Sequence, residues 1–155
     1  MNTLKLASLT LALTLGAFGT SIAAEPPAHQ MFAPEDLQWA DVAGLPAGAK
    51  MAVIEGPTDQ AVPFTFRVKF PAGYRVPAHW HPAAEHVTVL SGAVNLGLGD
   101  KLDKTKTHPL VAGGYAIMPA EVHHFGWTDV ETVIQVHGMG PWGITYVNPA
   151  DDPRN

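Results

Sequence analysis

Three side chains between Gly73 and Gly92 have the types and spacing that metal chemistry requires. His79 and His81 are separated by one residue, so on an extended strand both imidazoles leave the backbone on the same side. Glu85 follows four residues later, after a Pro-Ala-Ala stretch that allows a turn and can return the carboxylate on a neighbouring strand. Two neutral imidazoles and one carboxylate are typical ligands of a divalent metal. The alternative is that all three are ordinary polar groups at strand ends.

Short strands must position these groups. The stretch from Phe64 to Phe70 places Phe64, Phe66, Val68 and Phe70 on one face and polar residues on the other, which predicts a half-buried antiparallel strand. The next strand begins at Val76. Glu85 has the same parity as Val87 and Val89, and Val94, Leu96 and Leu98 alternate after Ser91-Gly92. This pattern predicts a hairpin whose apolar face carries the carboxylate.

The rest of the chain also favours strands joined by turns. Further candidates are Met51 to Glu55, Val111 to Met118, Glu131 to His137, and a short strand with Ile144 and Tyr146. Asp100 to Pro109 reads as an exposed loop, with His108 on the surface. With some eight strand candidates and no long helix, the sequence predicts an all-β barrel or jelly roll, because closure removes exposed edges and encloses a pocket.

The 155 residues suit one domain preceded by a targeting segment. Residues 1–24 contain Lys5, an apolar run from Leu6 to Ala17 and small residues before a cleavage point near Ala23 or Ala24, which is typical of a signal peptide. The alternative is an uncleaved membrane anchor. We expect export to the periplasm or the medium, with no membrane contact after removal of the signal.

Charge and cysteine content exclude several classes of function. Loss of Lys5 with the signal leaves eight basic against fourteen acidic residues, so nucleic-acid binding is not expected. The chain contains no cysteine, which excludes disulfides and thiolate ligands. Any metal must therefore be held by nitrogen and oxygen.

Three segments are expected in the mature chain: an arm over residues 25–50, a barrel over 51–147 and a polar, frayed tail over 148–155. The apolar anchors of the arm, Met31, Phe32, Leu37 and Trp39, are expected to cover the outer face of a sheet. An arm of this kind can also pair two copies of the chain, so a homodimer is one hypothesis.

These residues resemble the cupin family. The first cupin motif, G-x5-H-x-H-x3,4-E-x6-G, is met at every fixed position by Gly73, His79, His81, Glu85 and Gly92. The second motif, G-x5-P-x-G-x2-H-x3-N, is met by Gly113, Pro119 and His124 but departs from the pattern at Glu121 and Thr128. The chain is similar to exported single-domain bacterial cupins, and more loosely to the zinc-binding cupin domains of anti-sigma factors.

The resemblance implies a double-stranded β-helix, the jelly-roll cupin barrel, with a divalent metal held by His79, His81, Glu85 and His124. Glu121 replaces a glycine, which predicts a different local backbone and leaves the neighbouring His123 open as the ligand. The spacing from Pro119 favours His124, since adjacent strand residues face opposite sides.

Three imidazoles and a carboxylate leave one or two metal positions open to water or substrate. Iron or manganese would suit a dioxygenase or isomerase acting on a small oxygen-rich compound that binds through two oxygens. Zinc or nickel would favour hydrolytic or lyase chemistry. The ligand types do not select among the four metals.

The catalytic candidates are Glu85, His137 and Gln135. Gln135 and His137 share one face of their strand, opposite Ile134 and Val136. If the polar face points inward, they would donate hydrogen bonds or act as an acid and base; the alternative is that this face meets solvent or the arm.

Other residues near the motif have alternative interpretations. His86 is expected on the outer face, beside Glu85 in sequence. Trp80, Trp127 and Trp142 can wall the cavity or serve core and dimer packing. Residues 139–143, rich in glycine, can form a flexible lid.

The leading hypothesis is an exported metal-binding cupin that acts as an oxidoreductase of the dioxygenase type on a small-molecule substrate. The alternative from another class is a non-enzymatic cupin that binds or senses a metal or small molecule. A third hypothesis is a subunit whose main role is assembly through its arm.

Overall fold

The computed structural model describes residues 29–155, and nearly all regular structure in this range is strand. The helical segments of the described chain are three 3₁₀ turns of three residues each: η1 (Pro34–Asp36), η2 (Lys104–Lys106) and η3 (Pro149–Asp151). None of the helices in residues 29–155 is long and apolar enough to cross a bilayer. The expected signal peptide, residues 1–24, lies outside the described residues.

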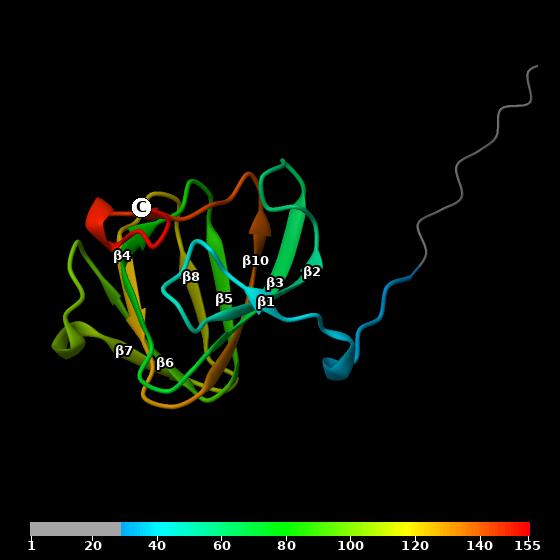
Figure 1. The fold of residues 1–155 in the computed structure, drawn as a ribbon, viewed down its shortest axis with the longest axis horizontal. Coiled ribbons are helices and arrows are strands. Elements are labelled where there is room, and N and C mark those ends of the chain that lie inside the picture. Colours follow the sequence, from blue (N-terminus) through cyan, green and yellow to red (C-terminus); the bar gives the residue numbers. More distant parts are fainter. Residues whose placement is uncertain (1–28) are drawn as a thin grey trace, which may run out of the picture. The chain divides into compact units, whose positions relative to one another are not determined.

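The first of two antiparallel sheets has six strands in the order β1-β2-β3-β10-β5-β8 (Figure 1). Their bounds are β1 (Ala40–Asp41), β2 (Lys50–Glu55), β3 (Pro63–Phe70), β10 (Thr132–Met139), β5 (Glu85–Ser91) and β8 (Tyr115–Met118). Strands β3, β10 and β5 form its centre, although they lie far apart in the sequence.

The second sheet has five strands in the order β11-β4-β9-β6-β7 and faces the first (Figure 1). Its strands are β11 (Thr145–Tyr146), β4 (Arg75–Trp80), β9 (His124–Trp127), β6 (Ala93–Leu98) and β7 (His108–Val111). Two facing antiparallel sheets with crossing connections form a jelly roll, so the predicted all-β fold is confirmed.

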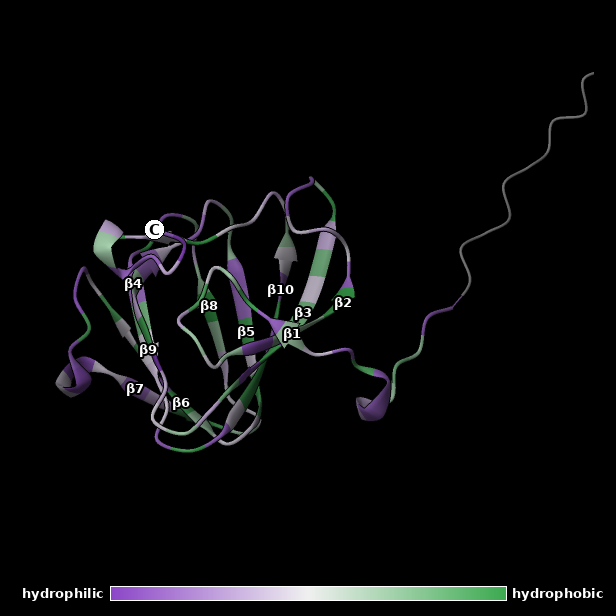
Figure 2. Cartoon of the chain, in the orientation of Figure 1, coloured by the Kyte–Doolittle hydropathy of each residue, from purple (hydrophilic) through white to green (hydrophobic). Residues whose placement is uncertain are grey.

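The core lies between the sheets. On β3 the four predicted apolar residues are buried and the intervening polar residues are only partly buried, and Figure 2 shows the resulting bands of hydropathy along this strand. Burying a side chain of this size stabilises the fold by roughly 1.5–3 kcal/mol relative to leaving it exposed. The same cluster takes in Val87 and Val89 of β5, Val94 of β6 and Ile134 and Val136 of β10.

The predicted hairpin between Glu85 and Leu98 is wrong. Strand β5 pairs with β10 and β8, whereas β6 pairs with β9 and β7 in the opposite sheet. Ser91-Gly92 therefore carries the chain from one sheet to the other. Gly92 has φ +74°, and a Cβ at this position would collide with the carbonyl oxygen of Glu131. Leu98, predicted to be on the buried face, is exposed.

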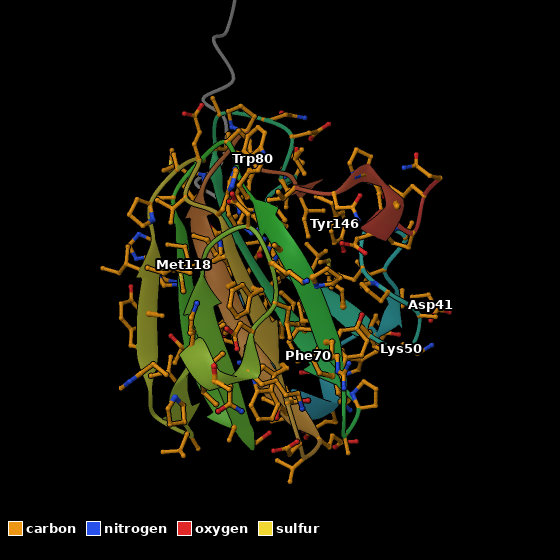
Figure 3. The ribbon with its side chains drawn as sticks, turned by 90° about the vertical axis from the view of Figure 1, so that its left-hand side faces the viewer. Asp41, Lys50, Phe70, Trp80, Met118 and Tyr146 are labelled. Carbon is orange, nitrogen blue, oxygen red and sulfur yellow. The ribbon has the colours of Figure 1, made fainter. Side chains whose placement is uncertain are left out.

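The segment predicted as an arm joins the first sheet through β1. The Lys50 Nζ and Asp41 Oδ1 atoms lie 2.7 Å apart where β1 meets β2 (Figure 3). Among the predicted anchors, Leu37 is buried. The Nζ atom of Lys69 lies over the Trp39 ring, 4.7 Å from its centroid. Met31 and Phe32 are 88% and 48% exposed, so the expected covering role is wrong for these two residues.

The loop between β1 and β2 closes one part of the barrel interior instead of lying outside it. Its residues Val42, Gly44 and Leu45 line the internal cavity. Tyr146 donates a hydrogen bond to the Gly44 carbonyl at 2.9 Å, and Tyr74 donates one to the Pro46 carbonyl. Burial raises the pKa of both phenols, that of Tyr146 to about 12, so both remain donors at neutral pH.

The tail was expected to fray, and this prediction is wrong. Asn148 caps η3 by accepting a hydrogen bond from the Ala150 amide. Arg154 donates to the Asp152 carboxylate and, at 3.1 Å, to the carbonyl of Ile144. Because Ile144 lines the cavity, the tail fixes one of its walls.

Candidate metal centre

Three histidines meet inside the barrel. His79 lies on β4 directly opposite His124 on β9, and His81 follows the end of β4. One nitrogen of each ring lies within 4.8 Å of the others, and the three residues are 3–6% exposed. Glu85, at the start of β5, reaches them from the opposite sheet rather than from a neighbouring strand as the sequence suggested.

Backbone carbonyls fix the orientation of all three imidazoles. The Nδ1 atoms of His79, His81 and His124 lie 2.7, 2.7 and 2.9 Å from the carbonyl oxygens of Pro77, Gly143 and Val122. A carbonyl oxygen only accepts, so each Nδ1 must carry the hydrogen. In the neutral ring the lone pair then resides on Nε2. This is the tautomer that a histidine metal ligand needs, and such contacts raise its basicity.

The carboxylate of Glu85 completes the cluster. Its Oε2 atom lies 3.3 Å from His81 Nε2 and 3.5 Å from His124 Nε2. In the neutral tautomer these three atoms are all acceptors, so their close approach in a buried place requires a shared positive charge. A proton on an imidazole or a divalent cation would supply it. With the ring neutral, the buried His81 Nε2 has no hydrogen-bond partner, as expected of a metal ligand.

Burial and mutual charge set the ionisation of the cluster. Burial, followed by the charges of protonated His124 and His81, lowers the pKa of His79 from 6.5 to about 3. Burial alone would raise the pKa of Glu85. Hydrogen bonds from His124 and His81, when these rings are protonated, outweigh that effect and lower it well below its ordinary value. His79 is therefore neutral and Glu85 ionised at pH 7, the forms that bind a metal.

The cluster opens onto a cavity of about 100 Å³ with an almost wholly apolar lining. Its walls include Val87, Val94, Leu96, Ile134, Val136 and Ile144. The hydroxyls of Tyr74 and Thr128 also border it, but both donate to backbone carbonyls. Among residues 29–155, neither a lysine nor an arginine lines this cavity. The space thus suits a small molecule with an apolar body whose polar atoms point toward the histidines.

The structure resolves the choice between the adjacent histidines in favour of His124. His123 Nδ1 pairs with the exposed Asp100 carboxylate at 2.6 Å, on the outside. The expectation that Glu121 changes the local backbone is wrong. Glu121 has φ +63°, the left-handed conformation that a glycine would adopt there, and its amide donates to the His81 carbonyl at 2.8 Å. The register of the turn is therefore kept.

Two of the three catalytic candidates lie outside the site. Ile134 and Val136 of β10 line the cavity, so Gln135 and His137 occupy the outer face. Gln135 accepts a hydrogen bond from Arg67 Nε at 3.1 Å there. An apolar interior excludes the polar side of the strand, which is why the inward alternative fails. His86 lies on the same outer face, as predicted.

Sequence reasoning underestimated the segment at residues 139–143. The Trp142 indole stacks on His81 with ring centroids 4.4 Å apart, and Gly143 supplies the carbonyl that holds His81 Nδ1. Backbone hydrogen bonds from Gly140 to Val62 and from Trp142 to Thr58 anchor the segment. The segment therefore holds His81 in place and does not form the expected lid. A tryptophan beside the glycines was the only available signal.

The tryptophans have different surroundings. Trp127 and Trp142 border the cavity, whereas Trp80 does not. The Nζ atom of Lys104 lies over the Trp127 ring, 3.7 Å from its centroid. Trp142 is thus the one of the three that contacts a predicted metal ligand directly.

Residues 27–142 match the family model of the ChrR cupin-like domain. This range includes all four predicted metal ligands. No curated protein sequence matches the chain.

Solved structures with the same fold are distant in sequence. The polyketide cyclase RemF from Streptomyces resistomycificus is 16% identical with a TM-score of 0.65, over 82% of this chain and 91% of that one. A candidate acetylacetone dioxygenase from Methylibium petroleiphilum is 17% identical with a TM-score of 0.60, over 83% and 88%. The anti-sigma factor ChrR of Rhodobacter sphaeroides, solved with SigE, is 21% identical with a TM-score of 0.51, over 68% and 50%. At these identities the likeness shows the fold alone.

Proposed function

The chain belongs to the ChrR cupin-like family, and from this premise we propose that it is a metal-dependent oxidoreductase of the dioxygenase type for a small dicarbonyl or enol compound. One observation carries the proposal. Three imidazoles with fixed Nε2 lone pairs and one carboxylate meet at the edge of a small apolar cavity. His79, His81 and His124 would hold the metal, with Glu85 as the fourth ligand.

The residues present fit a divalent metal of the iron or manganese class. When bound, such an ion would supply a Lewis acid with one or two open positions and access to dioxygen chemistry. The chain's own groups bind and orient. The Pro77, Gly143 and Val122 carbonyls prevent the imidazoles from rotating, and the Glu85 carboxylate balances the charge of a bound cation.

The cavity walls narrow the expected substrate. The sequence alone suggested an oxygen-rich compound. Among the described lining residues outside the histidine cluster, however, the buried side-chain donors without a partner are the indole nitrogens of Trp127 and Trp142. A second carboxylate together with a row of hydroxyls would need more partners than these two donors supply. Two neighbouring oxygens on an otherwise apolar body avoid this cost. We therefore propose a β-diketone or a similar enolisable dicarbonyl, cleaved at a carbon–carbon bond with both atoms of dioxygen entering the products.

Metal content tests the site. The full chain is purified and its bound metal measured by mass spectrometry, together with His124→Ala and, as the matched control, His123→Ala. We expect near-stoichiometric metal in the native chain and the control, and a loss of at least tenfold in His124→Ala. Equal metal in both variants would count against the site, because the two histidines are adjacent and only one of them points inward.

Turnover tests the reaction. Oxygen uptake by the iron-loaded or manganese-loaded chain is compared between acetylacetone and oxalate, which both bind through two oxygens but differ in apolar body and charge. We expect uptake with the diketone and none with oxalate. Uptake with oxalate alone would refute the substrate class while leaving the metal site intact.

The second candidate is a cupin that senses or binds a small molecule without turnover. The match to the ChrR cupin-like model favours it, since a ChrR structure was solved in complex with the sigma factor SigE. A diketone that shifts the melting temperature without any oxygen uptake would favour the sensing or binding role over the enzymatic one.

We also propose that the chain is exported. The apolar run between Leu6 and Ala17, preceded by Lys5, supports this location. Cell fractionation with N-terminal sequencing of the purified chain would test it, and an intact Met1 in the cytoplasmic fraction would contradict it.

A further inference from the structure

Two histidines on the outer face of the six-stranded sheet form a pair with the spacing of the central cluster. His86 of β5 and His137 of β10 are directly opposite each other on neighbouring strands, with ring centroids 5.0 Å apart. The rings of the central cluster are separated by 4.2–5.1 Å. The outer pair is therefore compact enough for both rings to ligate one ion.

The nitrogens of this pair have unusual partners. His86 Nδ1 lies 2.5 Å from the hydroxyl of Tyr115, which is 48% exposed on β8. His137 Nδ1 is buried and has no hydrogen-bond partner. A buried polar atom without a partner destabilises the fold, and a water or an ion commonly accounts for it. The dicarbonyl chemistry proposed above uses none of these groups.

We propose that His86 and His137 form a second, outward-facing site for a divalent transition metal of the copper or zinc class. Both ions favour imidazole nitrogen, and copper stands highest in the affinity order of the first-row divalent metals. The Tyr115 oxygen holds the His86 ring by accepting from Nδ1, which leaves the other ring nitrogen as the ligand. Two protein nitrogens and water make this site weaker than the central one.

The charges around the pair permit a cation. Thr65, directly opposite His137 on β3, donates to the Glu55 carboxylate at 3.2 Å. Arg67, two residues further along β3, is paired with the Gln135 side chain. Lys69 also lies on this face of β3, with its Nζ 4.7 Å from the centroid of the Trp39 ring. The charged group held at the strand position opposite His137 is nevertheless the Glu55 carboxylate, and its negative charge favours a cation there.

The test is a copper titration of the metal-stripped full chain, in which calorimetry and electron paramagnetic resonance measure the binding. We expect a tight and a weaker binding event in the native chain. His86→Ala and His137→Ala should each weaken the second event at least tenfold and keep the first, which also reports that the variant is folded. His81→Ala should do the reverse. His108→Ala, an exposed histidine on the other sheet, is the matched control and should change neither event.

Other outcomes would overturn the proposal. A single copper equivalent in the native chain, or a weaker event that survives His137→Ala and His86→Ala, would show that the pair binds no metal. Light scattering adds a third outcome. If either variant lowers the mass of the particle in solution without changing the number of copper ions bound per chain, this face is a contact between copies of the chain and not a metal site. Tyr115→Phe should weaken the second event by about tenfold, the usual effect of removing a group that orients a ligand.

Discussion

The interior of the barrel and the outer face of the six-stranded sheet use the same residue types in different ways. Along β5, Glu85 points into the barrel and His86 points out; along β10, Val136 points in and His137 points out. Inside, each imidazole is held through Nδ1 by a carbonyl of the main chain. Outside, His86 Nδ1 pairs with the hydroxyl of a partly exposed tyrosine, and His137 Nδ1 has no hydrogen-bond partner.

This difference indicates which histidines are organised before a metal arrives. The three carbonyls lie in a strand, in a turn and in a loop that a backbone hydrogen bond from Trp142 to Thr58 anchors, so the central rings lose little entropy on binding an ion. The outer rings must be ordered by the ion itself. Similar spacing therefore does not imply similar affinity, and we expect the inner site to dominate both metal content and stability.

The largest expected effect is the removal of the central metal. A ligand present at a thousandfold excess over its dissociation constant stabilises the folded state by about 4 kcal/mol. A chelator should therefore lower the free energy of unfolding by about that amount, as measured by urea denaturation. The chelator effect should vanish in His124→Ala and persist in His137→Ala. If the chelator lowers the free energy of unfolding equally in both variants, the proposed difference between the inner and outer histidines is wrong.

The next effect concerns the crossing that sets which side of β5 faces inward. Gly92 and Gly73 have nearly equal φ values of +74° and +76°, but a Cβ at Gly92 would meet the backbone of Glu131, whereas one at Gly73 meets nothing within 4 Å. Gly73→Ala should cost about 1–2 kcal/mol for backbone strain alone. Gly92→Ala should cost about 2–5 kcal/mol, because overpacking is added. Equal losses in thermal denaturation would show that the crossing is not the tight point.

Acid should destabilise the metal-free chain through its inner face. The folded pKa of His79, about 3, lies below its ordinary value of 6.5, so in this window the unfolded chain binds more protons. The contribution of His79 to the free energy of unfolding is complete above pH 6.5. It falls as the pH drops, by up to about 1.4 kcal/mol per pH unit. The lowered pKa of Glu85 acts in the same direction as the pH falls.

Urea denaturation in chelator at pH 7, 6 and 5 measures this slope. His79→Gln should flatten it, while His108→Gln, at an exposed position, should leave it unchanged. A slope that is the same in all three chains would show that the buried imidazole does not control acid stability.

Much of the fold was predictable because alternation reports burial directly. The pattern of Phe64 to Phe70 predicted β3 and its buried face correctly. Alternation does not name a strand's partner, however, and the hairpin prediction failed at Ser91-Gly92 for that reason. A serine-glycine pair suits a tight turn and a crossing between sheets equally well.

The residues of the cluster were predictable, three of them from types and spacing and His124 from the cupin resemblance, but the groups that support them were not. The groups that orient the rings are the carbonyls of Pro77, Gly143 and Val122, and a main-chain carbonyl leaves no mark in a sequence. The two faces of β10 were visible in the sequence, yet choosing the inner one required knowing that the cavity is apolar. Its apolar walls also changed the expected substrate.

The smallest expected effect tests whether the turn before His124 serves stability or the site. Glu121 holds a left-handed backbone that costs a non-glycine residue about 1–2 kcal/mol, while glycine adds about 0.4–1 kcal/mol of unfolded-state entropy. Glu121→Gly should therefore stabilise the chain by about 0.5–1 kcal/mol in urea denaturation. Its metal content should stay unchanged, because the hydrogen bond from the backbone amide of residue 121 to the His81 carbonyl remains. Ala120→Gly, in the same turn without positive φ, should destabilise the chain slightly. If Glu121→Gly instead loses metal, the glutamate side chain takes part in holding His124 on the inner face.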